Sequence, residues 1–153
     1  MEWAGVINNP LLRDLPFKIE LNKWGKILMS PVSNKHGRLQ YEVGKRIDRH
    51  KISGKVIMEC SIQTSDGVKV ADVAWASDAF IDEFGYSTPY RKAPEICVEI
   101  TSPSNSKGEI EEKVQLYLAK GAHEVWVVKE DGDTTYYAHE GRIVHSRELE
   151  AEE

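Results

Sequence analysis

The sequence predicts an α/β domain in which a central mixed β-sheet is flanked by helices and preceded by an N-terminal β-hairpin. The length of 153 residues suits a single domain. Short apolar runs bounded by turn residues alternate with two segments of helical spacing, in the order β-β-α-β-β-β-α-β-β. No repeat or linker divides the chain, so we expect one domain over residues 1–153, with a core at about 15–146 and an acidic tail at 147–153.

The N-terminal part is expected to form the hairpin and the first helix. Residues 17–30 indicate two short strands around a turn at 22–25. Ser33 or Asn34 can cap a helix that continues to about His50. The side chains on its expected inward face are His36, Leu39, Gln40, Val43 and Ile47.

Two strands follow, over 55–64 and 68–76, joined by a turn at 65–67. Alternation in the first of these strands places four side chains on one side, namely Val56, Met58, Cys60 and Ile62. Residues 77–94 show weak periodicity and contain Gly85, Pro89 and Pro94, which predicts an irregular connection with one helical turn.

The C-terminal part is expected to complete the sheet. A strand at 95–101 leads into a helix at 106–120, which Gly121 ends. The runs 124–129 and 134–139 then form a hairpin around Asp131-Gly132, and a last short strand is expected at 142–145.

The charge distribution is uneven. The net charge of −5 argues against tight nonspecific binding of nucleic acid by the whole surface. The tail carries one Arg and four Glu, whereas the stretch 35–55 holds seven Lys or Arg against Glu42 and Asp48. This basic stretch is compatible with a phosphate-bearing partner, but it is equally compatible with a solvated surface.

Two features bear on location. Cys60 and Cys97 lack metal-binding spacing and lie in apolar runs, so we expect two buried free thiols, which suit a reducing compartment. The N-terminus does not resemble a signal peptide, and no apolar run reaches the roughly 18 residues of a membrane span. We therefore expect a cytoplasmic protein without a membrane segment.

Two acids and a lysine break the patterns of their own elements. Asp72 lies in the middle of the run VKVADVAW, and Glu99 lies in EICVEIT, on the face opposite Ile96, Val98 and Ile100. A buried carboxylate costs several kcal/mol unless it is paired or binds a metal.

Lys113 shares the inward stripe of the second helix with Ile110, Val114, Tyr117 and Leu118. Two carboxylates, a lysine and a divalent ion would make a site that cleaves phosphodiesters. The residues alone leave open a structural ion pair without chemistry.

The run from Val68 to Gly132 resembles the Uma-type family of bacterial restriction endonucleases, a branch of the PD-(D/E)XK superfamily. The family pattern is a strand with PDV, then P-x-hhVEVhSPS, then D-x-x-x-K-x-x-x-Y, then G-h-x-E-h-W-h-V, where h is apolar. The matching residues are Asp72, Val98 to Ile100 with Ser102 to Ser104, Lys113, Tyr117, and Gly121 with Glu124 to Val128; upstream SPVSNKHGRLQ, with His36, also fits.

The resemblance implies a restriction endonuclease-like core and an endodeoxyribonuclease that uses Mg2+ or Mn2+ to act on DNA. Asp72 and Glu99 would hold the ion, helped by the carbonyl of Ile100, and Lys113 would position the water. Three positions depart from the pattern: Ala71 replaces proline, Glu109 replaces aspartate, and Thr101 stands where lysine is usual.

The departure at Thr101 and the net negative charge of the chain favour an alternative, a non-catalytic module that binds nucleic acid or a protein. If the chain cuts DNA, a homodimer is plausible. We also expect Asp72→Ala to abolish cleavage and leave the fold intact, because an acid at that position costs stability.

Auxiliary candidates are His36, Glu42, Gln63 and Tyr117. His36 can contact phosphate or metal at the site mouth, although packing or capping at the helix start is more common for a lone histidine. Glu42 can serve as an extra acid, or pair with Arg46 in solvent. Gln63 lies at a strand end with a surface position as the default, and Tyr117 is expected in the core with its hydroxyl near the site.

Overall fold

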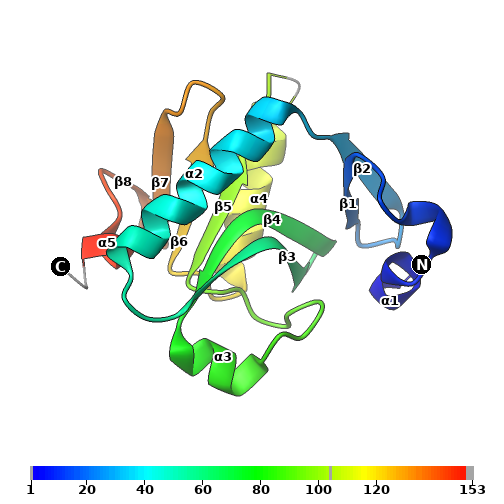
Figure 1. Ribbon diagram of the computed structural model, residues 1–153, viewed down its shortest axis with the longest axis horizontal. Coiled ribbons are helices and arrows are strands. Elements are labelled where there is room, and N and C mark those ends of the chain that lie inside the picture. The colour runs from blue at the N-terminus through cyan, green and yellow to red at the C-terminus, as the bar shows by residue number, and fades with distance from the viewer. Residues whose placement is uncertain (1, 104, 151–153) are drawn as a thin grey trace.

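Two helices cover opposite faces of a six-stranded sheet in the computed structural model, which describes residues 2–103 and 105–150 (Figure 1). Its strands lie in the order β3 (Lys55–Thr64), β4 (Gly67–Ala76), β5 (Ile96–Ile100), β6 (Glu124–Val128), β7 (Thr134–Ala138) and β8 (Gly141–Ile143). β5 and β6 are parallel, and the other neighbours are antiparallel. The predicted mixed α/β sheet is therefore confirmed.

The two long helices begin and end as their capping residues predict. The Ser33 hydroxyl accepts a hydrogen bond from the backbone of His36 at the start of α2 (Asn34–His50). Ser106 caps α4 (Lys107–Ala119) in the same way, and Gly121, with φ of 105°, follows its last turn. The α2 face packs on one apolar cluster with Val73, Trp75 and Val98, and α4 packs on a second with Ala74, Cys97 and Val125.

Three short helices were not predicted: α1 (Trp3–Ile7), the 3-10 helix η1 (Pro10–Leu12) and α5 (Arg147–Glu150). A fourth, α3 (Asp78–Phe84), lies in the connection for which one helical turn was predicted. α3 is longer than the single turn expected in the connection, because Ser77 caps it and Phe80 is buried. α5 lies in the predicted acidic tail, whose last three residues are outside the described part of the chain.

The N-terminal hairpin forms a separate two-stranded sheet, β1 (Phe17–Leu21) and β2 (Ile27–Pro31). It lies beside the first half of β4 (Figure 1). A third apolar cluster joins them, and its buried members are Trp3, Val6, Leu21, Val68 and Val70. Gly67 permits the close approach, because a Cβ there would lie 2.4 Å from the backbone of Asn22.

The strand pair β3–β4 is interrupted where Glu59 faces Asp72. The ladder pairs Met58 with Val73 and Cys60 with Ala71, but the pair between them is missing, and Glu59 has a φ of 54°. The prediction that Val56, Met58, Cys60 and Ile62 share one side is wrong. Val56 packs with the α2 cluster, whereas Cys60 and Ile62 belong to the α4 cluster. The left-handed conformation at Glu59 breaks the alternation that the prediction assumed.

Six of the seven basic residues in the stretch 35–55 are exposed, and Lys51 is the exception. Lys51 is buried, with its ammonium 3.2 Å from Glu148 and 4.1 Å from the centre of the Trp75 ring. Arg46 donates to the hydroxyl of Tyr136 at 2.8 Å and lies against the Trp126 ring. Among the described residues, no helix combines the length and the apolar character that a bilayer span requires.

Candidate active site

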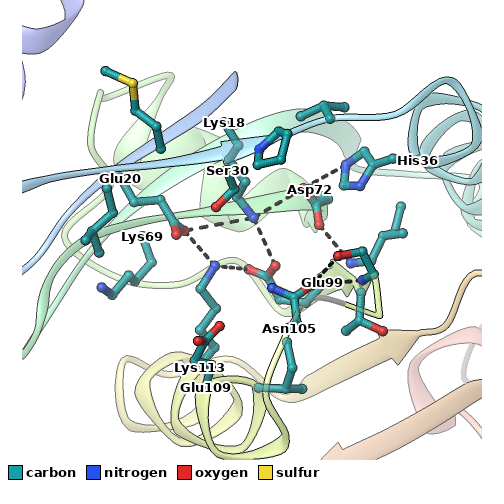
Figure 2. Close-up of a pocket in the computed structure, with 18 of the residues that line it drawn as sticks. Lys18, Glu20, Ser30, His36, Lys69, Asp72, Glu99, Asn105, Glu109 and Lys113 are labelled. Atoms are coloured by element: carbon teal, nitrogen blue, oxygen red, sulfur yellow. Dashed lines mark hydrogen bonds and ion pairs between the residues drawn. The ribbon is translucent and has the colours of Figure 1, made fainter. Parts of the chain in front are cut away.

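A cleft of about 840 Å3 lies between the hairpin, the start of α2, the end of β5 and the first turns of α4 (Figure 2). Six of its ionisable side chains lie within 4 Å of one another in a connected group, and they come from five different elements. They are Lys18 and Glu20 of β1, His36 of α2, Asp72 of β4, Glu99 of β5 and Lys113 of α4. The three residues singled out in the sequence, Asp72, Glu99 and Lys113, therefore line one cleft.

Asp72 is fully buried at the point where β4 passes from its contact with β1 to its pairing with β5. Its Oδ2 accepts a hydrogen bond from the backbone N–H of Ile100 at 2.7 Å. Its Oδ1 lies 3.2 Å from the Lys18 ammonium and 3.2 Å from Nε2 of His36, yet among the described residues no donor meets it with hydrogen-bond geometry. This buried oxygen therefore faces two groups that can carry positive charge.

The pKa of Asp72 shows that the ionised acid is favoured in the fold. Burial alone would raise this pKa, but the charge of Lys18, the close approach of His36 and the hydrogen bond from the backbone of Ile100 hold it at about 2. The folded protein therefore binds the proton more weakly than the unfolded chain does, so the ionised carboxylate stabilises the fold at neutral pH. The expectation that Asp72 costs stability did not take these partners into account, because they were not visible in the sequence.

Glu99 is held by three side chains. Its Oε2 accepts from the Lys18 ammonium at 2.9 Å, and its Oε1 accepts from the Tyr117 hydroxyl at 2.7 Å. The Lys113 ammonium lies 3.4 Å from the same Oε1. Burial raises the pKa of Glu99, and the neighbouring carboxylates add to this effect although the lysines oppose it.

Lys18 and Glu20 were missed by sequence reasoning. Both are buried on one face of β1, and Glu20 accepts from the backbone of Val70 at 2.7 Å and from Lys113 at 2.8 Å. The alternation in FKIEL places them on the same side of a strand, which was the available signal. Nothing in the sequence indicated that this side is buried against β4.

The auxiliary candidates divide into two groups. His36 reaches Asp72 and Tyr117 reaches Glu99, so both lie at the site. Burial raises the pKa of the Tyr117 hydroxyl well above its usual range, and the Asp72 carboxylate, 3.2 Å from Nε2, raises the pKa of His36. Gln40 donates to the backbone carbonyl of Asp72 at 2.7 Å and also reaches Glu59.

The other two candidates lie elsewhere. Glu42 forms an exposed pair with Arg38 at 2.8 Å, not with Arg46 as expected. Gln63 is exposed and donates to the carbonyl of its neighbour Thr64. Of the SPS motif, Ser102 binds Asn105 ahead of α4, and Ser104 lies outside the described residues.

The donor set suits a hard cation that keeps part of its water shell. Within residues 2–103 and 105–150, no group of three or more His, Cys, Asp or Glu is arranged to hold a metal ion. Asp72 and Glu99, however, both face the Lys18 ammonium, and Mg2+ is commonly bound by one or two carboxylates together with water and substrate phosphate. The buried acceptor Oδ1 of Asp72, which lacks a hydrogen-bond donor, fits this use.

Comparison with known proteins places the chain in a family. The model of the Uma2 family, described as "Putative restriction endonuclease", matches residues 11–151. A crystal structure from Anabaena variabilis ATCC 29413, of a "putative nuclease belonging to DUF820", superposes with a TM-score of 0.67. It is 18% identical over 88% of this chain and 84% of that chain, which shows a shared nuclease fold. No curated protein matches the sequence. The chain belongs to the Uma2 family of restriction endonuclease-like proteins.

Proposed function

We propose that the protein is a metal-dependent endonuclease that hydrolyses phosphodiester bonds in DNA. The observation that carries this proposal is the meeting of Asp72, Glu99 and Lys113 in one cleft, although they are far apart in the sequence. Acidic ligands beside an ammonium group are the components that phosphodiester hydrolysis requires. The family and the fold of its neighbour support a nucleic-acid substrate.

Asp72 and Glu99 would hold the ion, Mg2+ or Mn2+, with the carbonyl of Ile100 as a further ligand. When bound, such an ion lowers the pKa of a water ligand and polarises a phosphoryl oxygen. The backbone N–H of Ile100 already fixes Asp72, and the Tyr117 hydroxyl fixes Glu99. Both carboxylates are therefore oriented before any ion arrives, which lowers the entropic cost of binding.

Lys113 would orient the attacking water or balance the charge that develops on the phosphate. Its ammonium spans Glu20 and Glu99, at 2.8 and 3.4 Å, and its side chain is the more exposed of the two lysines, at 18% against 7% for Lys18. This exposure places a charge at the open side of the cleft, where a phosphate would approach. The lysine thus serves from α4, since β5 ends in Ile100 and is followed by Thr101 where lysine is usual.

The test is cleavage of plasmid DNA with Mg2+ or Mn2+ by the wild type, Asp72→Asn and Glu112→Gln. Asp72→Asn should lower the cleavage rate at least about a hundredfold. Glu112 lines the same cleft and is exposed, so its variant controls for a lost negative charge. Undiminished cleavage by purified Asp72→Asn would contradict the assignment.

The bridging position of Lys18 favours a second candidate, a non-catalytic module that binds nucleic acid or protein. An ammonium between Asp72 and Glu99 already neutralises the charge that would attract an ion. This candidate predicts no divalent-ion binding at the acids. Calorimetry that detects a Mn2+ site in the wild type and loses it in Glu99→Gln would exclude it.

We further propose a cytoplasmic location and, for cleavage of both strands, a homodimer. The buried free thiols of Cys60 and Cys97 support a reducing compartment. Burial raises the pKa of Cys60 to about 12, so its thiol is protonated and unreactive at neutral pH. Analytical ultracentrifugation with and without DNA tests the dimer.

A further inference from the structure

The ammonium of Lys18 lies between the two carboxylates proposed as metal ligands (Figure 2). It is 2.9 Å from Oε2 of Glu99, 3.2 Å from Oδ1 of Asp72 and 3.9 Å from Oε2 of Glu20. Lys113 differs in this respect, because its ion pairs among the described residues are with Glu20 and Glu99 and not with Asp72. Lys18 is thus the cation shared by both ligands.

An ammonium and a divalent ion cannot use these oxygens together. Mg2+ requires ligand oxygens at about 2.0–2.1 Å, so an ion bound by both acids would fall inside the space that the Lys18 ammonium fills. The two cations would also repel each other strongly in a buried site. Binding of the ion therefore requires the ammonium to leave.

We propose that Lys18 is a resident counter-cation that holds Asp72 and Glu99 in place of the metal, and that a divalent ion binds only by displacing it. This inference rests on the proposed function insofar as it takes these two acids as the metal ligands. It assigns to Lys18 a positioning role: the lysine pairs with both acids and orients them while no ion is bound, and it lowers the apparent affinity for the ion.

The surroundings of Lys18 allow the displacement. Lys18 belongs to β1, which pairs only with β2 and stands outside the six-stranded sheet, so its movement leaves the pairing of β4 and β5 intact. Glu20 already lies 3.9 Å from the ammonium on the same strand face. A small rotation of the flexible lysine stem toward Glu20 would give the displaced charge a new partner, so the ammonium need not become buried without one.

Calorimetric titration with Mn2+ of the wild type, Lys18→Met and Lys113→Met tests the proposal. Both substitutions remove one positive charge next to Glu99, so general electrostatics should strengthen binding similarly in both. Displacement predicts a further gain only in Lys18→Met, which should bind Mn2+ at least about tenfold more tightly than the wild type and about fivefold more tightly than Lys113→Met.

Each other outcome has its own meaning. Equal affinities in the two variants, both abolished by Glu99→Gln, overturn the displacement and leave the proposed function in place. Binding by Lys18→Met but not by the wild type supports displacement and overturns metal-dependent activity of the natural chain. Absence of binding in all three proteins overturns the metal site and the displacement together.

A measurement on the wild type keeps the proposal testable if Lys18→Met does not fold. Reductive methylation, followed by mass spectrometry of the peptide that contains Lys18, reports how accessible its amine is. The buried ammonium should react slowly without metal and at least about threefold faster in saturating Mg2+, while the exposed amine of Lys107 should react at an unchanged rate. A Lys18 rate that is constant or lower in saturating Mg2+ overturns the displacement.

Discussion

Buried carboxylates lie at both ends of the parallel pair β5–β6, a single one at the start of β6 and two near the end of β5. Different kinds of hydrogen-bond and ion-pair partner satisfy them. At the start of β6, Glu124 accepts from the Trp126 indole at 3.0 Å and the Ser146 hydroxyl at 2.7 Å. It also accepts from the backbone of Arg147 at 2.7 Å and of Glu148 at 3.0 Å, which open α5. All four donors are neutral, and each is fixed by backbone or by packing.

Near the end of β5, by contrast, Asp72 and Glu99 depend on the ammonium groups of Lys18 and Lys113. One Asp72 oxygen lacks a donor with hydrogen-bond geometry. A carboxylate saturated by neutral donors has no acceptor capacity left for an ion. A carboxylate held by ammonium groups on flexible side chains can exchange them for another cation. The difference separates a structural acid from acids suited to metal chemistry, although all three are buried.

The largest expected difference between the two ends is in the rate of cleavage after a Glu-to-Gln substitution at each of them. Glu99→Gln should lower metal-dependent cleavage about a thousandfold, because it removes a charged ligand of the ion. Its effect on stability should be the smaller one, since burial raises the pKa of Glu99 and so disfavours the ionised form in the fold. Cleavage per folded molecule should be unchanged in Glu124→Gln. Equal losses of cleavage in the two variants would contradict the division of roles.

The converse effect is expected in the free energy of unfolding. Glu124→Gln should destabilise the protein by about 3 kcal/mol, because an amide NH2 would face backbone donors that then lose their acceptor. Chemical denaturation monitored by circular dichroism measures this loss. Proteolysis should also release the segment that contains α5, since its first N–H groups bind Glu124. A stability loss larger in Glu99→Gln than in Glu124→Gln would reverse the assignment.

Three charged residues of the cleft could be identified from the sequence because each is a charged residue among apolar neighbours. Asp72 and Glu99 interrupt apolar strands, and Lys113 falls on the apolar stripe of its helix. Lys18 and Glu20 could not be identified in this way, because their strand is short. The strand that buries them, β4, lies about 50 residues further along the chain. A charged residue shows as an anomaly only when its own segment shows that it is buried.

The sheet and both long helices were predictable because periodicity and capping residues are local signals. The interruption at Glu59 was not, since its surroundings come from another element: Gln40 of α2 donates to the Asp72 carbonyl and to the Glu59 carboxylate beside the missing pair. The same holds for the tail. The sequence predicts it only as an acidic segment outside the core, yet Leu149 is buried and Glu124 binds the start of α5. Long-range contacts decided each of these cases.

The pH dependence of stability sharpens the comparison further. The pKa of Asp72 is lowered from 3.8 to about 2, so its stabilising contribution is complete above pH 4 and is lost as the pH falls toward 2. In metal-free buffer, the wild type should exceed Asp72→Asn in stability by about 2 kcal/mol at pH 6. The difference should shrink steadily between pH 4 and pH 2. Because the difference is taken between two proteins, titrating groups remote from Asp72 cancel, and a constant difference over this range would contradict the ion pairing of Asp72.

The smallest expected effect comes from removing a hydroxyl at each end. Tyr117→Phe deletes the donor to Glu99, so the carboxylate loses part of its orientation and Mn2+ affinity should fall about threefold. Tyr136→Phe is the matched control, because its hydroxyl is paired with Arg46 and its ring packs on Trp126, the partner of Glu124. That variant should lose stability and keep the affinity for Mn2+. If both variants weakened Mn2+ binding alike, the effect would come from general loosening of the core, and Tyr117 would have no specific part in orienting Glu99.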